Sequence, residues 1–179
     1  MPAGLCPTVG VAGLTLGGGI GYSSRKHGLM CDNVISFEVV DANGQVIIAD
    51  SVTNSDLYWA LRGGGHGSFG VVTKFVFRVF DASKPVTLIK KEYFGTFAKA
   101  FRQYQNWVFS YEDIKSVASS LSFNFEKRIS TVTVVIEPDS EEEKSDILGK
   151  VLKVFNDSNT SYVEEMSFIK MHVMFGDMK

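Results

Sequence analysis

A run of glycines near the amino terminus is the first feature of this sequence that could bind a ligand. Residues 17–21 read Gly-Gly-Gly-Ile-Gly. Glycine lets a backbone approach a ligand closely and present amide N–H groups to anionic oxygens. No Gly-Lys-Ser or Gly-Lys-Thr follows, so the run is not a Walker phosphate-binding loop. A flexible turn without a ligand is the alternative interpretation.

A second glycine cluster spans residues 63–70 and carries the spacing G-x-G-x-x-G at Gly65, Gly67 and Gly70. In a dinucleotide-binding fingerprint this spacing follows a strand and opens a helix, so that the pyrophosphate meets the helix N-terminus. Here the sequence predicts a helix before the cluster and a strand after it. A Rossmann site is therefore excluded, and a tight turn into a strand is the plain structural interpretation.

One cysteine stands shortly before the first cluster. Cys6 and Cys31 are the two cysteines of the sequence, too few for a disulfide framework. A single cysteine is more often a small buried hydrophobic residue than a reactive group. Taken alone, Cys6 therefore leaves both interpretations open.

The elements that must position these residues fall into two regions. Glycine is dense from residue 4 to 70, and amphipathic patterns replace it after a polar boundary at residues 81–85. In the first region the pattern predicts one short helix, three strands and a glycine-rich turn or short ribbon. The turn or ribbon covers residues 10–21, the strands 34–40, 45–49 and 71–80, and the helix 55–61, capped by Asn54 or Ser55 and ended by Gly63.

The second region has a regular alternation of strands and helices. Strands are predicted at residues 86–93, 117–125, 129–136 and 162–167, and helices at residues 96–111 and from a cap at Asp139 or Ser140 to about 156. The order βαββαβ predicts an α+β layer with a mostly antiparallel sheet and helices on one face. Lys90 and Lys91 are predicted to lie at a solvated strand edge.

Composition excludes several classes of function. The formal net charge is −2, without the clustered basic excess of a nucleic-acid-binding protein. No stretch is long and apolar enough to predict a membrane span, no secretory signal is recognisable and no metal site is predicted. Ordered patterns start at the first residues and an apolar stretch closes the chain, so we expect a fragment of a longer protein.

Together, the cysteine and the glycine clusters resemble one family. In order and spacing, most of the first region is similar to the second flavin-contacting segment of the berberine bridge enzyme-like proteins, which have the vanillyl-alcohol oxidase (PCMH-type) FAD-binding fold. The second region resembles the family's substrate domain more weakly, best at residues 165–169. The matching segments are Cys6-Pro7-Thr8-Val9-Gly10, Gly13, residues 17–21, 27–29, 32–34, 39–44, 56–65 and 68–72.

The resemblance implies an FAD site and a role for its residues. Cys6 stands where the family has the cysteine bonded to flavin C6, and Val9 stands beside the flavin, where oxygen-reactive members often carry valine. A second link, from a histidine to the 8α carbon, is expected in an upstream segment. The expected cofactor-binding residues are Cys6, Val9, Gly10, Gly13, Gly17, Gly18, Gly19 and Gly21 on the flavin and phosphate side, with Gly70, Val71 and Val72 near the adenine.

The same resemblance implies the fold and the domains. Residues 1–82 are expected to form the C-terminal half of a PCMH-type FAD-binding domain, and residues 83–179 the start of an antiparallel-sheet substrate domain. The sequence departs from the family pattern at Leu14 or Thr15, where plant members often have histidine, and at His66, where a small or polar residue is usual. His66 is therefore interpreted as a loop residue.

The implied activity is that of an FAD-dependent oxidase. We expect oxidation of a small-molecule alcohol, sugar or activated C–H group with oxygen as the acceptor, no nucleic-acid or membrane partner, and no activity of the fragment alone. No catalytic base is assigned, because the tyrosines present all fit strand or helix packing. Two alternatives remain open at this point: a truncated, inactive product that keeps the fold without flavin, and an α+β ligand-binding module. Relatives are often secreted, but this sequence assigns no compartment.

Overall fold

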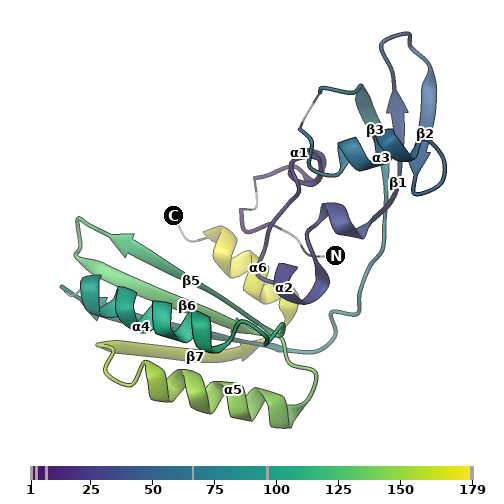
Figure 1. Cartoon of the computed structure of the whole chain (residues 1–179). Helices are drawn as coiled ribbons and strands as arrows, with labels where there is room; N and C mark the ends of the chain where they lie inside the picture. The colour runs from purple at the N-terminus through teal and green to yellow at the C-terminus, as the bar shows by residue number, and fades with distance from the viewer. Residues whose placement is uncertain (1, 3, 7, 66, 96, 178–179) are drawn as a thin grey trace. The chain divides into compact units, whose positions relative to one another are not determined.

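The computed structural model describes residues 2, 4–6, 8–65, 67–95 and 97–177, and Figure 1 shows their elements in chain order. The chain divides into two compact units, Met1–Asp81 with Phe175–Lys179, and Ala82–Met174. The identity of these units with an FAD-binding and a substrate domain stays a prediction. Pro7 and His66 lie outside the described residues.

The first unit contains a three-stranded antiparallel sheet with the order β2-β1-β3. The strands are β1 (Val34–Val40), β2 (Val46–Asp50) and β3 (Val71–Phe77). Phe37 and Val39 of β1 point into a small core because alternate side chains of a strand face the same side, and Val34 joins this core across a register shift between Val34 and Ser36. Val34, Phe37 and Val39 are at most 3% exposed there. The predicted strand 71–80 was three residues too long.

Helices flank this sheet in the sequence. They are α1 (Val11–Leu16), α2 (Ser24–His27), the 3₁₀ helix η1 (Cys31–Asn33) and α3 (Ser55–Leu61). The predicted turn or ribbon over residues 10–21 was wrong in its first half, where α1 forms. The Thr15 hydroxyl donates to the Val11 carbonyl at 2.7 Å inside α1, and Thr15 and Leu16 are buried, so packing outweighs the low helix propensity of the glycines.

The beginning of α3 also differs from the prediction. Asn54 occupies the N-cap position, but its φ is +48° and its side chain makes no cap hydrogen bond. The side-chain amide of Asn54 donates instead to the Ile48 backbone carbonyl at 2.8 Å. Asn54 therefore joins the helix to β2, and Asn tolerates the left-handed conformation better than most residues do.

The second unit is a four-stranded antiparallel sheet with the order β5-β6-β4-β7. Its elements are β4 (Val86–Phe94), α4 (Phe97–Ser110), β5 (Val117–Asn124), β6 (Ile129–Ile136), α5 (Glu141–Val154) and β7 (Thr160–Met166). The predicted order βαββαβ is confirmed, and every pair in the sheet is antiparallel. A further helix, α6 (Phe168–Asp177), was not predicted.

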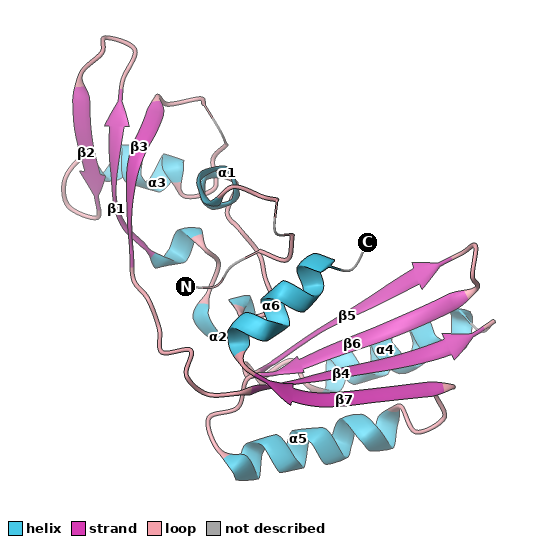
Figure 2. Cartoon of the chain, turned by 180° about the vertical axis from the view of Figure 1, so that it is seen from behind, coloured by secondary structure: helices cyan, strands magenta, loops and turns pink. Residues whose placement is uncertain are grey.

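One face of this sheet holds the main core. Figure 2 shows α4 and α5 beside the same sheet, and their buried residues Trp107 and Ile147 join the strand residues Ile89 and Val134 in one cluster. The register aligns Ile89 with Val134, so both side chains lie on the helix-covered face. The opposite face carries mainly polar residues: Lys90, Glu92, Ser120, Ser122, Thr131, Thr133, Tyr162 and Glu164.

Two hydrogen bonds between Glu143 and the residues that precede the helix fix the start of α5. The Ser140 hydroxyl accepts a hydrogen bond from the Glu143 amide at 3.1 Å, as the sequence predicted for one of its two candidate caps. The Glu143 carboxylate accepts from the Asp139 amide and from the Ser116 hydroxyl. The three acidic residues of the first turn also complement the helix dipole.

Lys91 contradicts the prediction of a solvated edge. β4 is a central strand, and Lys91 shares the helix-covered face with Ile89 and Tyr93, where it is only 5% exposed. Within the described part of the chain its amine has no hydrogen-bond or ion-pair partner. Burial lowers the pKa of Lys91 below its ordinary value of 10.5, because a low-polarity environment disfavours the charged form.

No helix among the described residues is long and apolar enough to cross a bilayer.

Replacement of the buried amine should stabilise the second unit. We expect Lys91→Met to raise the free energy of unfolding by about 1 kcal/mol at pH 7, because it removes a partly desolvated charge that has no ion-pair partner among the described residues. Between the lowered folded pKa and 10.5 the unfolded chain binds more protons than the folded one, so wild-type stability rises with pH in that window. The advantage of Lys91→Met should therefore shrink as the pH approaches 10.5.

Urea unfolding at several pH values measures this effect. Lys127→Met is the control, because Lys127 lies in the exposed turn between β5 and β6; it should change stability by about 0.5 kcal/mol or less. A loss of stability in Lys91→Met at pH 7 would contradict the assignment of Lys91 as an unpaired buried lysine.

Candidate functional site

The first glycine segment, residues 17–21, follows α1 directly and is fixed by two backbone hydrogen bonds. The Gly19 carbonyl accepts from the Met30 amide and the Gly18 carbonyl from the Cys31 amide, both at 2.9 Å. Gly18 and Gly19 have φ values of +101° and +77°, which L side chains rarely adopt. A Cβ on Gly19 would lie 2.6 Å from the Met30 Cβ, so this close approach requires glycine.

The hydrogen bonds leave only some of the segment's amides available to a ligand. The Gly17 amide donates to the Gly13 carbonyl, and the Gly18 amide to the Thr15 carbonyl. The Gly21 amide donates to the Ser24 hydroxyl at 2.9 Å. The amides of Gly19 and Ile20 have no acceptor in the part of the chain that the structure describes. Donation to a ligand is therefore concentrated at two successive residues.

The structure brings the two glycine clusters together. The Gly65 amide donates to the Leu16 carbonyl at 3.3 Å, and a Cβ on Gly63 would lie 3.6 Å from the Gly18 Cα. Gly63 itself has a φ of +107° just beyond α3. The second cluster thus packs against the beginning of the first, which the spacing of its glycines did not reveal.

Two of the three predicted adenine-side residues, Gly70 and Val72, make contacts within the first unit that explain their residue types. Gly70 has a φ of +128°, and a Cβ there would lie 2.6 Å from the Val40 carbonyl oxygen. Val72 pairs with Val39 and packs against the small core, whereas Val71 is 67% exposed. A turn into β3 accounts for Gly70, and the exposed Val71 leaves room for the predicted contact.

Cys6 and Val9 lie at the two ends of one turn. The Val9 amide donates to the Cys6 carbonyl at 3.3 Å, the i to i+3 bond of a β-turn. The Cys6 thiol is exposed and Val9 is 50% exposed. Gly10 follows as the N-cap residue of α1, and a Cβ on it would meet nothing within 4 Å. The turn therefore presents both predicted flavin contacts at the surface of the unit.

Cys31, the second cysteine, is buried. Desolvation, with a smaller contribution from the neighbouring Asp32 carboxylate, raises the pKa of the Cys31 thiol. The thiolate is the reactive form of cysteine. Cys31 is therefore a packed residue, and Cys6 is the accessible thiol of the pair.

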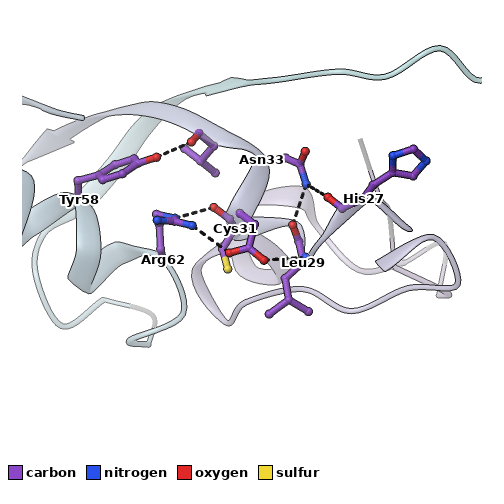
Figure 3. A network of polar contacts seen from close by, with 8 residues as sticks. His27, Leu29, Cys31, Asn33, Tyr58 and Arg62 are labelled. Carbon is purple, nitrogen blue, oxygen red and sulfur yellow. Dashed lines mark hydrogen bonds and ion pairs between the residues drawn. The ribbon is translucent and has the colours of Figure 1, made fainter. Parts of the chain in front are cut away.

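Figure 3 shows a polar network that the sequence did not predict. The Arg62 Nε donates to the Cys31 carbonyl at 2.9 Å, and its Nη2 lies 2.9 Å from an Asp32 carboxylate oxygen. The side-chain amide of Asn33 donates to the backbone carbonyls of His27 and Leu29, both at 2.9 Å. The Arg62 bonds join the end of α3 to the loop that follows the first glycine segment, and the Asn33 bonds stabilise that loop internally.

Two further contacts complete this network. The Tyr58 hydroxyl donates to the Val34 carbonyl at 2.6 Å, and the Arg62 guanidinium lies 5.2 Å from the centre of the Tyr58 ring. The partners are separated by 24 to 31 residues in the sequence. The spacing of residues along the sequence does not predict contacts between partners this far apart.

The sequence has clear relatives among known proteins. A model of the FAD binding domain matches residues 1–50. The chain is 43% identical over 107 residues to the uncharacterized FAD-linked oxidoreductase YvdP of Bacillus subtilis, covering 59% of this chain and 24% of that protein. It is 51% identical over 89 residues to Berberine bridge enzyme-like 12 of Arabidopsis thaliana, covering 50% of this chain and 16% of the relative.

Solved structures match nearly the whole chain. BBE-like 1 of Physcomitrella patens is 34% identical with a TM-score of 0.86, over 98% of this chain and 37% of that one. The xylooligosaccharide oxidase of Myceliophthora thermophila C1, solved with xylobiose, is 30% identical with a TM-score of 0.81 and the same two coverages. A glucooligosaccharide oxidase of Acremonium strictum, described with a 6-S-cysteinyl, 8α-N1-histidyl FAD, is 26% identical with a TM-score of 0.80, over 97% of this chain and 36% of that one.

Over the part that it spans, the chain has the PCMH-type FAD-binding fold of the vanillyl-alcohol oxidase group. Its matched segments are similar to the berberine bridge enzyme-like FAD-linked oxidoreductases. It spans about a third of the solved relatives and a quarter or less of the curated ones named above. The expected fold class and the resemblance to this family are confirmed, whereas the assignment of individual site residues stays a prediction.

Glycine substitutions should separate the crowded positions from the open ones. We expect Gly70→Ala to lower the free energy of unfolding by about 2 kcal/mol or more, because it combines a positive φ with a steric clash against Val40. Gly10→Ala should change it by about 0.5 kcal/mol or less, because Gly10 has a φ of −70° and open space around its Cα.

Thermal and urea unfolding of the two variants make this comparison. Equal losses of stability in both would show that the open surroundings of Gly10 are not maintained in solution.

Proposed function

We propose that this chain carries the flavin-contacting part of an FAD-dependent oxidase that acts on an alcohol, a sugar or an activated C–H group with oxygen as the acceptor. The observation that carries the proposal is the exposed Cys6 thiol in a turn that leads through Gly10 and α1 into the open glycine segment. The xylooligosaccharide and glucooligosaccharide oxidases among the similar structures support a carbohydrate as the substrate class.

The residues present fit the cofactor that the family implies. An accessible thiol can form a covalent bond, and the neighbouring Val9 presents an apolar surface. The amides of Gly19 and Ile20 can donate to acceptor oxygens, and Ile20 is exposed. A ligand with several acceptor oxygens and a flat ring matches this combination of donors and bare backbone.

Each group of residues would have a separate task. Cys6 would tether the cofactor, Val9 would border its ring, and the backbone of residues 17–21 would bind its polar oxygens. Gly70, Val71 and Val72 would border the adenine end. Bound FAD supplies the acceptor of the substrate's electrons, while the protein supplies placement and electrostatics.

The polar face of the second sheet supports a hydroxyl-rich substrate. It lies opposite the face covered by α4 and α5 and carries Lys90, Thr131 and Tyr162 among its outward residues. Glu92 accepts a hydrogen bond from the Thr160 hydroxyl on this face at 2.9 Å. Donors and acceptors in such a row suit the hydroxyl groups of a sugar. We assign no catalytic base among them.

The chain spans only part of the length of its relatives, which suggests that it is inactive by itself. Because the chain spans 37% of the xylooligosaccharide oxidase, we propose that it does not oxidise a substrate by itself. A product that keeps the fold but never binds flavin is the competing candidate, and flavin binding separates the two.

Substitution of Cys6 tests the covalent link. After incubation of the purified chain with FAD, acid precipitation should leave flavin in the pellet, and Cys6→Ala should reduce that flavin at least about tenfold, because a covalent tether survives denaturation whereas noncovalent contacts do not. Flavin fluorescence in a denaturing gel provides the measurement.

Cys31→Ala is the matched control, because Cys31 is the buried cysteine and should retain the acid-stable flavin. Equal retention by Cys6→Ala and the wild type would rule out the tether. Complete removal of flavin from every variant by acid would favour the flavin-free candidate. Turnover of xylobiose by the chain alone would contradict the proposed inactivity.

A further inference from the structure

Arg62 connects the second glycine cluster with the first through the loop between them. It stands at the end of α3, directly before Gly63, and its guanidinium reaches the Cys31 carbonyl and the Asp32 carboxylate, each at 2.9 Å. The side chains of Arg62 and Asp32 are 29% and 48% exposed, so this is a surface network rather than part of the core (Figure 3).

The same loop holds the glycine segment by its backbone. Cys31, whose carbonyl accepts from Arg62, donates its own amide to the Gly18 carbonyl. Its neighbour Met30 donates to the Gly19 carbonyl. The Asp32 carboxylate also accepts from the Leu29 amide at 2.9 Å, which fixes the loop one turn earlier. A single side chain therefore restrains the donors that define the conformation of Gly18 and Gly19.

We propose that Arg62 is a positioning residue for the cofactor site: it keeps residues 18–20 in the conformation in which the amides of Gly19 and Ile20 remain available to an acceptor oxygen of FAD. The ligand in this statement rests on the proposed function. Arg62 makes no contact with the ligand in this proposal and acts through Cys31 and Asp32.

The geometry requires arginine rather than a cation in general. Nε and Nη2 donate to two different acceptors, one a backbone carbonyl and one a carboxylate. The planar guanidinium supplies such a fork, whereas a lysine amine is a single point charge on a flexible stem. Tyr58 lies against the guanidinium and is itself held by the Val34 carbonyl. Lysine should therefore keep the attraction to Asp32 and lose the bond to Cys31.

An exposed ion pair contributes little to global stability, so the test must read the local conformation. Hydrogen exchange of the unliganded chain measures protection of the Met30 and Cys31 amides. We expect exchange about tenfold faster in Arg62→Met and an intermediate value in Arg62→Lys, with the β4 and β6 amides unchanged. Arg102→Met, at an exposed arginine of α4, is the matched control and should leave Met30 and Cys31 protected.

Binding of FAD supplies the second readout. Titration of flavin fluorescence should give a Kd that rises about tenfold in Arg62→Met, partly recovers in Arg62→Lys and is unchanged in Arg102→Met. Faster exchange with an unchanged Kd would overturn the positioning role. Unchanged protection of Met30 and Cys31 in a folded Arg62→Met chain would overturn the inference altogether.

Two outcomes of these experiments require a further variant or a separate conclusion. If Arg62→Met also loses protection in β4 and β6, Asp32→Asn decides the question, because it removes the carboxylate charge and keeps the side-chain shape; unchanged exchange at Met30 in that variant would overturn the inference. If the wild-type chain binds no FAD, the proposed function fails, while faster exchange in Arg62→Met would still support the ordering of the segment by Arg62.

Discussion

Two backbone hydrogen bonds, from Cys31 to Gly18 and from Met30 to Gly19, are the constraint on which the rest of the candidate site depends. They use the carbonyls of the glycine segment and force two successive positive φ angles, which only glycine adopts without strain. The close approach to Met30 then excludes a side chain at Gly19. Around this contact α1 ends, the second glycine cluster packs, and Arg62 closes the loop from the other side.

Regular elements could be predicted from the sequence where the side chains alternate between core and solvent. β1 and β6 have the predicted bounds, β2 begins one residue later than predicted, and the Ser140 cap places the start of α5. α1 escaped prediction because Gly10, Gly13 and Gly17 dilute its helical pattern. Its stability comes from the burial of Thr15 and Leu16, and tertiary packing of this kind has no local signature.

In the candidate site, too, features with a local sequence pattern were predicted and features set by distant contacts were not. The glycines and Cys6 were recognisable because their types and spacing match a known family, and their role in binding a cofactor stays a prediction. Arg62 was missed because it acts on residues about thirty positions earlier in the chain. Lys91 was wrongly predicted to lie at a solvated edge. β4 is a central strand because it pairs with both β6 and β7, and two neighbouring lysines in the sequence do not reveal that pairing.

The direction of the hydrogen bonds in the glycine segment has a consequence for ligand discrimination. The carbonyls of Gly18 and Gly19 are occupied from within the protein, whereas the amides of Gly19 and Ile20 and the carbonyls of Gly17 and Ile20 have no partner among the described residues. At Gly19 the backbone therefore offers a free donor beside two occupied carbonyls. A ligand that places an N–H or O–H group at this point would lose a bond to water without replacement, so the backbone of Gly18 and Gly19 favours an oxygen acceptor there before any side chain takes part.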